Sequence, residues 1–445
     1  MGTSKVTHLP VDTGVSGWNA ILPEQDPLVS LTTDTIADYL VIGGGFAGLS
    51  AARRLSQLKP DARIIILEAK RIAEGPAGRN SGFMIDLPHE LSSTDYATTQ
   101  DKDRNQIALN RQAIAFAADA AKEYGLTKEA YNPCGKINGA ATERAAAYNA
   151  SYASHLDQLN EPYELYDAAR MQAITGSSFY KSGLFSPGTV MLQPALYVQG
   201  LSRGLANKVS CFEKSPVTSL DRLNGKWLAK TPHGSVSADK VILGVNGHIE
   251  SFGRFERQVF HVMLYASMTR ALTPEEASQT GEEIWGITPS DPMATTMRKI
   301  SGSGGTRIVT RNRMSYVPTM AVSQDHVALM CKTHQASFEK RHLGLRGVEQ
   351  EFSWAGRLCL SRNSAPAFGE VAEGLISACC QNGLGTTGGT LSGMAAAELA
   401  FEGETPLVQS MISKGKPRHL PPAPVDYFGA TAFIRWGEFN ARHEL

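Results

Sequence analysis

Three glycines and one acidic residue form the most informative pattern in this chain. Gly43, Gly45 and Gly48 have the spacing GxGxxG, and Glu68 follows twenty residues after Gly48. In such a pattern the first glycine permits a tight turn, the second lets backbone approach a pyrophosphate, and the third lets a helix pack closely on a strand. A carboxylate at Glu68 would accept hydrogen bonds from both ribose hydroxyls and repel a 2′-phosphate, which argues against NADP.

The elements around these residues are the ones the chemistry needs. The apolar run at 37–42 predicts a buried strand, the apolar spacing at 46–58 predicts a helix, and the run at 63–67 predicts a second buried strand. Strand, glycine turn, helix and strand make a βαβ unit, and the start of its helix would supply amides and partial positive charge to a phosphate. The pattern predicts dinucleotide binding; the alternative is a glycine turn without a ligand.

Two further stretches of small residues favour FAD over NAD. They are GPAGRNSGF at 75–83 and QNGLGTTGG at 381–389, and the second opens the last predicted helix, at 389–401. Amides at that helix start would stabilise negative charge on a reduced flavin. An NAD dehydrogenase would share only the first βαβ unit, and neither stretch has a role there. The other interpretation of the second stretch is an ordinary helix start with glycines for packing.

These motifs together resemble a known family. The segments VIGGGFAGLSAA, LEA, GRNSGF, ADKVILGVNG, WAGRL and QNGLGTTGGTLSGMAAAELA occur in the order found in the D-amino-acid oxidase superfamily, in the branch of glycine, sarcosine and γ-glutamylputrescine oxidases. The resemblance spans roughly residues 30–405 and is weak over 96–165 and 255–350. It implies an α/β plus α+β fold of the glutathione-reductase type, in which a Rossmann-like FAD-binding domain is interleaved with a substrate domain built on a mixed or antiparallel sheet with flanking helices.

The resemblance also implies the residues that bind FAD. Those expected at the ADP half are Gly43, Gly45, Phe46, Ala47, Gly48 and Glu68, with the Val217 backbone at the adenine. Those expected along the isoalloxazine are Arg79, Asn80, Ser81, Gly82 and Phe83, with Gly385, Thr386, Thr387 and Gly388 near N1 and the C2 carbonyl. The remaining expected cofactor contacts are Ala69, Lys70, Gly78, Asn246, Gly247, Gly356, Gly383 and Leu384.

Composition shifts suggest the domain organisation. We expect an extended lead-in at 1–35 lying over the body, a discontinuous FAD-binding domain at 36–95, 165–254 and 352–410, a substrate domain at 96–164 and 255–351, and a C-terminal surface segment at 411–445. The tail from Lys414 is too rich in proline and basic residues to predict a regular element.

In this family an amine loses hydride from the carbon next to its nitrogen, so positioning carries most of the catalysis and no triad is expected. Arginine suits bidentate binding of a substrate carboxylate. Period-two alternation at 306–316 places Arg307, Arg311 and Arg313 on one face. By position in the family, Arg298 matches the carboxylate-binding arginine, and Arg307 is nearly as good because the turn between them is long; otherwise these are solvated strand charges.

Three other side chains enter the prediction. Tyr265 and Tyr316 are candidates to orient the carboxylate, although such tyrosines are more often core or edge residues. Cys359 is near the position where sarcosine oxidases attach flavin through a thioether, but a lone cysteine in a strand is usually a small buried hydrophobe, so non-covalent FAD is favoured. His261 is read as a core residue, and no metal site is expected.

Composition limits the partners. Lys plus Arg and Asp plus Glu both total 43 in 445 residues, so nothing draws the whole chain onto nucleic acid or an acidic membrane. Six cysteines without CxxC spacing fit the reducing cytoplasm, and no run of apolar residues is long enough to span a bilayer.

The sequence therefore predicts an FAD-dependent oxidase of a small primary or secondary amine or amino acid, such as sarcosine, glycine, iminodiacetate or a γ-glutamyl-polyamine. O2 is the expected acceptor, reduced to H2O2, and the imine would hydrolyse. The alternatives are an amino-acid dehydrogenase that passes electrons to a quinone or protein, and a flavin-binding subunit without amine chemistry.

Overall fold

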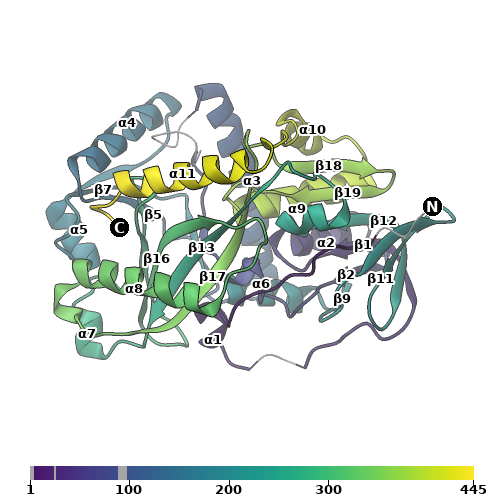
Figure 1. Cartoon of the computed structure of the whole chain (residues 1–445), viewed down its shortest axis with the longest axis horizontal. Coiled ribbons are helices and arrows are strands. Elements are labelled where there is room, and N and C mark those ends of the chain that lie inside the picture. The colour runs from purple at the N-terminus through teal and green to yellow at the C-terminus, as the bar shows by residue number, and fades with distance from the viewer. Residues whose placement is uncertain (1–4, 25–26, 89–97) are drawn as a thin grey trace.

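A computed structural model describes residues 5–24, 27–88 and 98–445, and it contains two large sheets side by side (Figure 1). The strands are β1 (Thr35–Ile42), β2 (Ile64–Leu67), β3 (Phe83–Met84), β4 (Tyr131–Asn132), β5 (Lys136–Ala140), β6 (Glu164–Asp167), β7 (Ser182–Ser186), β8 (Val190–Leu192), β9 (Val209–Phe212), β10 (Ser219–Leu223), β11 (Lys226–Lys230), β12 (Ser235–Leu243), β13 (Phe260–Thr269), β14 (Trp285–Pro289), β15 (Thr296–Ile300), β16 (Arg307–Tyr316), β17 (Gln350–Leu360), β18 (Ala367–Ala372) and β19 (Leu375–Cys379). The helices are α1 (Gly17–Ala20), α2 (Phe46–Leu58), α3 (Gln100–Glu123), α4 (Glu143–Leu159), α5 (Ala168–Thr175), α6 (Pro194–Leu205), α7 (Pro274–Ser278), α8 (Gln324–Arg341), α9 (Thr387–Phe401), α10 (Pro406–Ser413) and α11 (Val425–Asn440), with 3-10 turns η1 (Pro76–Gly78), η2 (Asn246–Phe252) and η3 (Leu343–Leu345).

The first sheet belongs to the dinucleotide-binding half. Its strands β12, β1, β2 and β9 pair in parallel, β19 extends β12 on the other side, and β10, β11 and β18 add antiparallel partners. The sheet is apolar on both faces because each face is covered, which is why its central strands read as continuous hydrophobic runs. The predicted βαβ unit is confirmed, with the helix at 46–58 as expected.

Helices α2 and α9 cross on one face of this sheet at close range. A Cβ at Gly393 would lie 2.2 Å from the Ala47 carbonyl oxygen, and one at Gly48 would lie 1.8 Å from the Gly43 carbonyl oxygen. Glycine is therefore required at both positions by packing rather than by backbone dihedrals. The close crossing brings the N-terminal ends of both helices to the same edge of the sheet.

The second sheet is the substrate-domain sheet, with the order β17-β13-β16-β15-β14-β5-β7-β6. Except for β14 and β5, its neighbouring strands pair antiparallel. Helix α8 packs on β13, β16 and β17, and helices α4, α5, α8 and α11 surround this half in Figure 1. This confirms the predicted mixed sheet with flanking helices.

The N-terminal strap, residues 5–16, is largely extended and packs on the body, whereas the predicted extended lead-in at 1–35 also contains helix α1. Its Val6 amide donates to the Thr218 carbonyl and its Thr7 amide to the Ser251 carbonyl. Farther along, the Thr13 hydroxyl reaches the Val322 carbonyl near the start of α8. The strap therefore connects the two halves of the molecule.

Several elements differ from the sequence expectation. Helices α6 and α8 were not predicted, and helix α11 follows a tail that was expected to lack regular structure. Strands β6 and β7, in the range assigned to the FAD-binding domain, pair in the second sheet instead. The other domain boundaries stay a prediction, and residues 89–95 lie outside the described chain. No helix in the described residues is both long enough and apolar enough to cross a bilayer.

A buried histidine between β13, β16 and α8 makes stability depend on pH. The Ser267 hydroxyl lies 2.6 Å from His334 Nδ1, and His334 Nε2 lies 3.3 Å from the Asn312 carbonyl oxygen. Burial lowers the pKa of His334 from 6.5 to about 4. Between pH 6.5 and about 4 the unfolded chain binds a proton at this histidine that the folded chain does not. The free energy of unfolding therefore decreases as the pH is lowered through this range, by at most about 1.4 kcal/mol per pH unit.

We therefore expect His334→Gln to flatten the pH dependence of stability between pH 6.5 and 4. The measurement is denaturant unfolding at a series of pH values. The control is the exposed His443→Gln, which should keep the parental slope. Equal slopes for all three proteins would show that His334 is not a source of the dependence.

Candidate functional site

The glycine turn after β1 forms an open cradle at the start of α2. Gly43 has φ of +101°, and a Cβ there would lie 2.6 Å from the Gly244 carbonyl oxygen. Gly45 is different: its φ of −91° suits any residue, and its Cβ position has only the Ala77 Cβ nearby, at 3.5 Å. Gly45 thus faces space. The first amides of α2 border that space and have no partner inside the helix.

Glu68 closes the cradle at the end of β2. Its carboxylate accepts hydrogen bonds from the Gly44 amide at 2.8 Å and the Lys70 amide at 2.9 Å. Burial raises the pKa of Glu68, while these two amides pull it back toward the ionised form. Each oxygen keeps a lone pair for a further donor, as a ribose diol would require.

An elongated cavity runs from this cradle toward the second sheet and encloses about 1460 Å³ of empty space, counting its open mouth. Its walls come from nine separate stretches of the chain, between residues 6 and 389. The predicted cofactor residues that line it are Gly43, Gly45, Phe46, Ala47, Glu68, Ala69, Lys70, Asn80, Val217, Asn246, Gly247, Gly383 and Gly385. The cavity brings together residues from both ends of the sequence, as the predicted site requires.

The strap forms one wall of the cavity. Asp12 lies at its centre, with Arg357 Nη2 at 2.8 Å, Lys70 Nζ at 3.2 Å and Arg79 Nε at 3.9 Å from its carboxylate oxygens. Three cations around one carboxylate leave net positive charge at the wall. That charge suits an anionic ligand such as a pyrophosphate. Arg357 also donates to the Val11 carbonyl at 2.6 Å, which fixes the strap against β17.

We expect Asp12→Asn to weaken cofactor retention because the variant loses the carboxylate that joins the strap to β17 and to Lys70. Loss of charge-assisted contacts of about 1.5–3 kcal/mol corresponds to a rise in the cofactor dissociation constant of roughly tenfold to 100-fold. Titration of the apoprotein with FAD measures it. Asp34→Asn, in the same N-terminal region but bonded to Ser235, is the control and should bind normally. A parental dissociation constant for Asp12→Asn would contradict the role of the strap.

Side-chain hydrogen bonds to backbone carbonyls hold the segment 74–83 in place. The Arg79 guanidinium donates to the Glu74, Thr13, Gly14 and Ala355 carbonyls, so Arg79 points away from the cavity. Trp354 Nε1 donates to the Arg79 carbonyl at 3.0 Å, and Trp18 Nε1 to the Asn80 carbonyl at 2.9 Å. These contacts give the segment a defined backbone at the interface of the two halves.

One buried side chain at the cavity has hydrogen-bonding groups that a polar ligand could use. Both ring nitrogens of His248 are buried and have no hydrogen-bond partner among the described residues. Burial lowers the pKa of His248 to about 3, so the ring is neutral and offers one donor and one acceptor to the cavity. Three features are consistent with a bound dinucleotide. They are the buried His248 ring without a partner among the described residues, the open space next to Gly45, and the lone pairs that the Glu68 carboxylate keeps for further donors.

Comparison with known proteins decides the family. The family model described as "FAD dependent oxidoreductase" (DAO) matches residues 38–399, which is most of the chain. The chain belongs to this family. The FAD cofactor predicted from the sequence is therefore confirmed, and the protein is an FAD-dependent oxidoreductase of the DAO family.

Individual relatives are distant. The chain is 26% identical to a probable oxidoreductase OrdL of Haemophilus influenzae over 83% of this chain and 84% of the relative, and 22% identical to γ-glutamylputrescine oxidoreductase of Escherichia coli over 84% and 85%. Glycine oxidase from Geobacillus kaustophilus superposes with a TM-score of 0.70 at 18% identity, covering 87% of this chain and all of that one. These structural likenesses confirm the DAO fold.

Some predicted FAD residues support the site without lining the described cavity. The Thr386 and Thr387 hydroxyls donate to the Phe83 and Ile85 carbonyls, so they tie the start of α9 to β3. A Cβ at Gly78 would lie 2.0 Å from the Ala73 carbonyl oxygen. The predicted residues outside the cavity lining are Gly48, Gly78, Arg79, Ser81, Gly82, Phe83, Gly356, Leu384, Thr386, Thr387 and Gly388. Their direct contact with FAD stays a prediction.

Two of the predicted substrate arginines are engaged in structural contacts. Arg298 donates to the Ser81 and Leu192 carbonyls at 2.5 and 2.9 Å and stacks on Trp18 and Phe83. Burial lowers the pKa of Arg298 to about 10. Arg307 donates to the Gly304 and Thr269 carbonyls and pairs with Glu351. Arg298 thus supports the segment at 81–83, and Arg307 fixes the edge of β16.

Arg311 does not line the cavity described above. It is half-buried on β16, where its cross-strand neighbour is Ala266 of β13, and the neighbour of Ala266 on β17 is Trp354. Side chains of directly opposed residues point to the same face of a sheet. Arg311 therefore shares a face with Trp354, whose indole bonds the Arg79 carbonyl in the predicted flavin-lining segment.

The predicted alternation of three arginines was wrong at Arg313. A register shift between β13 and β16 gives Arg313 a φ of +60°, and its guanidinium lies 3.1 Å from Glu438 of α11. A bulge of this kind adds a residue and reverses the side-chain alternation beyond it. Arg313 therefore belongs to the attachment of α11.

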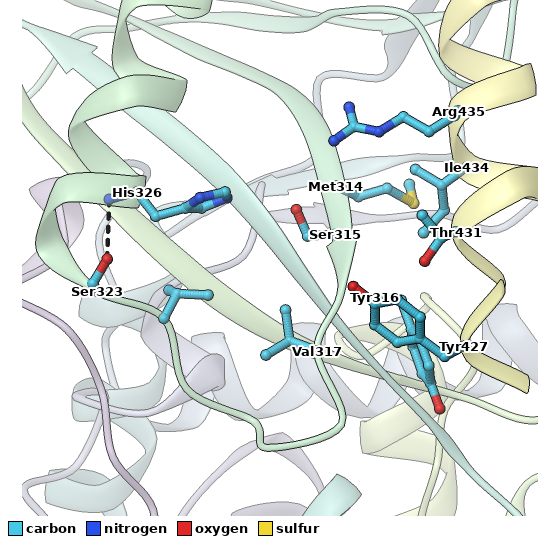
Figure 2. A pocket seen from close by; sticks show the side chains of 11 residues that line it. Met314, Ser315, Tyr316, Val317, Ser323, His326, Tyr427, Thr431, Ile434 and Arg435 are labelled. Carbon is cyan, nitrogen blue, oxygen red and sulfur yellow. Dashed lines mark hydrogen bonds between the residues drawn. The ribbon is translucent and has the colours of Figure 1, made fainter. Parts of the chain in front are cut away.

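Neither predicted tyrosine lines the flavin cavity. Tyr265 is fully buried against His326 and Val327 of α8. Tyr316 makes an edge-to-face contact with Phe260 and a tilted ring contact with Tyr427, and it borders a second cavity between β16, α8 and α11, shown in Figure 2. Burial raises the pKa of Tyr316 to about 12.

Sequence reasoning missed part of the cavity wall. The missed residues include Val6, His8, Leu9, Pro10 and Asp12 of the strap, and His248, His261, Met320, Arg357 and Gln381. The His261 ring, read as a core residue, pairs with Glu250 at the cavity wall. The strap contains no sequence motif, so no local pattern could have predicted that it lines the cavity. Arg357 was within reach, because it lies inside the recognised segment WAGRL.

Proposed function

We propose that this protein is an amine or amino-acid oxidase that acts on a small primary or secondary amine bearing a carboxylate. The observation that carries the proposal is the row Arg311, Ala266 and Trp354 across β16, β13 and β17, which directs a guanidinium to the face that contacts the predicted flavin-lining segment. A guanidinium there can bind a carboxylate by two parallel hydrogen bonds and fix the α-carbon. The names of the relatives, glycine oxidase and γ-glutamylputrescine oxidoreductase, support the same substrate class.

The chain's own residues act mainly by positioning. FAD, when bound, supplies the hydride acceptor. The cradle at Gly43–Gly45 and Glu68 would hold its ADP half, and the first turn of α9 would place amides where negative charge develops. Neutral His248 can donate one hydrogen bond and accept another without changing its protonation at working pH. The strap forms one wall of the cavity and so reduces its exposure to water.

We further propose O2 as the acceptor, giving H2O2, and hydrolysis of the released imine to an aldehyde or oxo acid. The competing functions are a dehydrogenase that passes electrons to a quinone or protein, and a flavin subunit without amine chemistry. Sarcosine, glycine, iminodiacetate, D-alanine, D-proline and γ-glutamylputrescine are the first substrates to test.

The proposal is tested by adding these amines anaerobically and following the absorbance of oxidised flavin at about 450 nm. Bleaching by one of them, with peroxide formed on admitting air, is the expected result. Bleaching without peroxide would favour the dehydrogenase. Flavin that none of the amines bleaches would contradict the proposed function and favour the subunit role.

We also propose that the flavin is bound non-covalently and that the protein works in the cytoplasm. Cys359 lines the cavity, but a hydrogen bond with Cys380 and burial raise the pKa of its thiol well above the usual value, which disfavours the nucleophilic thiolate. All six cysteines are free, which suits a reducing compartment. Acid precipitation tests the first statement: the yellow colour should stay in the supernatant.

A further inference from the structure

Helix α11 presents an apolar face to solvent. Phe428, Phe433, Trp436 and Phe439 are between 58% and 67% exposed, and Val425 is 60% exposed. With Gly429 and Ala432 between them, these residues recur every three to four positions and so form one continuous stripe along the helix. We call this stripe the α11 face. Scattered exposed hydrophobics are ordinary, but a contiguous aromatic stripe marks a surface that another body covers.

The orientation of the helix is fixed by polar contacts on its inner side. Buried Glu438 pairs with Arg313 of β16, and Ile434 is buried beside it. Beyond the helix, buried Glu444 accepts hydrogen bonds from the Ala141 and Thr142 amides, and Arg341 donates to the Glu444 carbonyl at 2.6 Å. The helix therefore places charge inward and aromatic rings outward, the reverse of an ordinary surface helix. Figure 1 shows it as the yellow helix lying along the surface of the substrate-domain half.

The charges around the face have one sign. In residues 414–445 the exposed charged side chains are Lys416, Arg418, Arg435 and Arg442, all cations, and of these Arg435 is paired with the buried Glu438. The three acids of this region are not free: Asp426 is near Arg257, and Glu438 and Glu444 are buried. Although the whole chain has no net charge, this end of it shows solvent only positive charge and apolar rings.

We propose that the α11 face docks the enzyme on an anionic lipid membrane as a peripheral, non-spanning anchor. Tryptophan and phenylalanine on one side of a helix, with Lys and Arg at its flanks, is the composition that lies in the headgroup layer. Each cation near an anionic surface adds to the attraction. The proposal departs from the sequence expectation that nothing draws the whole chain onto an acidic membrane. The proposal is independent of the substrate proposed above.

A second copy of the chain is a poorer occupant for this face. Across a two-fold axis the same patch meets itself, and here that would bring Lys416, Arg418 and Arg442 of each copy toward those of the other, with no exposed acidic side chain in residues 414–445 to offset them. An anionic surface removes that repulsion. Charge complementarity thus favours lipid over self-association.

Vesicle flotation of the flavin-loaded protein tests the proposal, with vesicles of phosphatidylcholine and phosphatidylglycerol and with vesicles of phosphatidylcholine alone. We expect flotation with the anionic vesicles and a decline as salt rises. The double variant Phe433→Ser, Trp436→Ser should lower the membrane partition coefficient by about tenfold or more, because two large aromatic side chains are lost from the interface. Arg418→Glu with Arg442→Glu should abolish the preference for anionic lipid.

The matched control is Leu165→Ser with Leu343→Ser, two aliphatic residues 63% and 59% exposed elsewhere on the surface. It should float like the parent, and flavin content and light scattering verify folding and oligomeric state for every variant. A parent that does not float at low salt overturns the proposal. So does a parent that is a dimer in solution, is dissociated by the aromatic double variant, and shows no affinity for vesicles.

Discussion

Gly45→Val should yield a folded protein that contains no flavin. The backbone at Gly45 is in a conformation open to any residue, and the nearest atom to a new Cβ is the Ala77 Cβ at 3.5 Å, so the protein itself tolerates the side chain. The same side chain would occupy the space next to the first amides of α2, where backbone must approach the pyrophosphate. We expect the purified variant to lack the flavin absorbance near about 450 nm and to show no amine-dependent activity.

Two other glycines separate this effect from misfolding. Gly48→Ala would place a Cβ 1.8 Å from the Gly43 carbonyl oxygen and should therefore lower the unfolding midpoint as well as flavin content. Gly429→Val, on exposed α11 with no neighbouring atom within 4 Å of its Cβ position, should keep normal flavin. Full flavin content in Gly45→Val with an unchanged absorbance spectrum would show that the pyrophosphate does not bind at this cradle.

The flavin half was predictable because its constraints are local in sequence. The turn at 43–48 follows a strand and opens a helix, so one short segment shows both the geometry and the chemistry. Glu68 is placed by the length of a βαβ unit alone. Even here the sequence did not reveal the contacts of Arg79. Its guanidinium binds four backbone carbonyls, and Arg79 does not line the cavity.

The substrate half was harder because its residues are placed by pairing between distant strands. Alternation of side chains along the strand predicted that Arg313 shares a face with Arg307 and Arg311. A bulge opposite Leu264 and Tyr265 instead directs Arg313 toward Glu438. Tyr265 faces α8, a helix that the sequence pattern did not predict. A register shift depends on the partner strand and leaves no trace in a one-strand pattern.

The strap and α11 were missed for a related reason. Asp12 lies in a stretch without periodicity, and its role comes from Lys70, Arg79 and Arg357, which are far from it along the chain. The proline-rich residues before α11 indicated a surface segment, and the helix beyond them is stabilised by distant residues such as Arg313 and Arg341. Elements whose stability is tertiary are the ones that local propensity predicts least well.

Arg311→Met should impair oxidation of carboxylate-bearing substrates specifically. Arg311 shares its face with Trp354, whose indole bonds the predicted flavin-lining segment. Removing one member of a buried charge pair costs about 2–5 kcal/mol, which corresponds to roughly a 30-fold or greater fall in kcat/KM. Steady-state kinetics with the amine that bleaches the flavin, and with the amide of the same compound, measure it.

The comparison of acid and amide makes the result specific to the carboxylate. The parent should prefer the acid, and Arg311→Met should lose that preference while its activity on the amide changes little, because the lost interaction is with the carboxylate alone. Arg311→Lys should recover only part of the preference, since an ammonium cannot form the two parallel hydrogen bonds of a guanidinium. Arg307→Met, on the same strand and face, should reduce stability through its lost contact with Glu351 but keep the preference for the acid. An unchanged preference in Arg311→Met would mean that a different cation binds the carboxylate, and Arg357, which lines the cavity beside Asp12, would be the next to test.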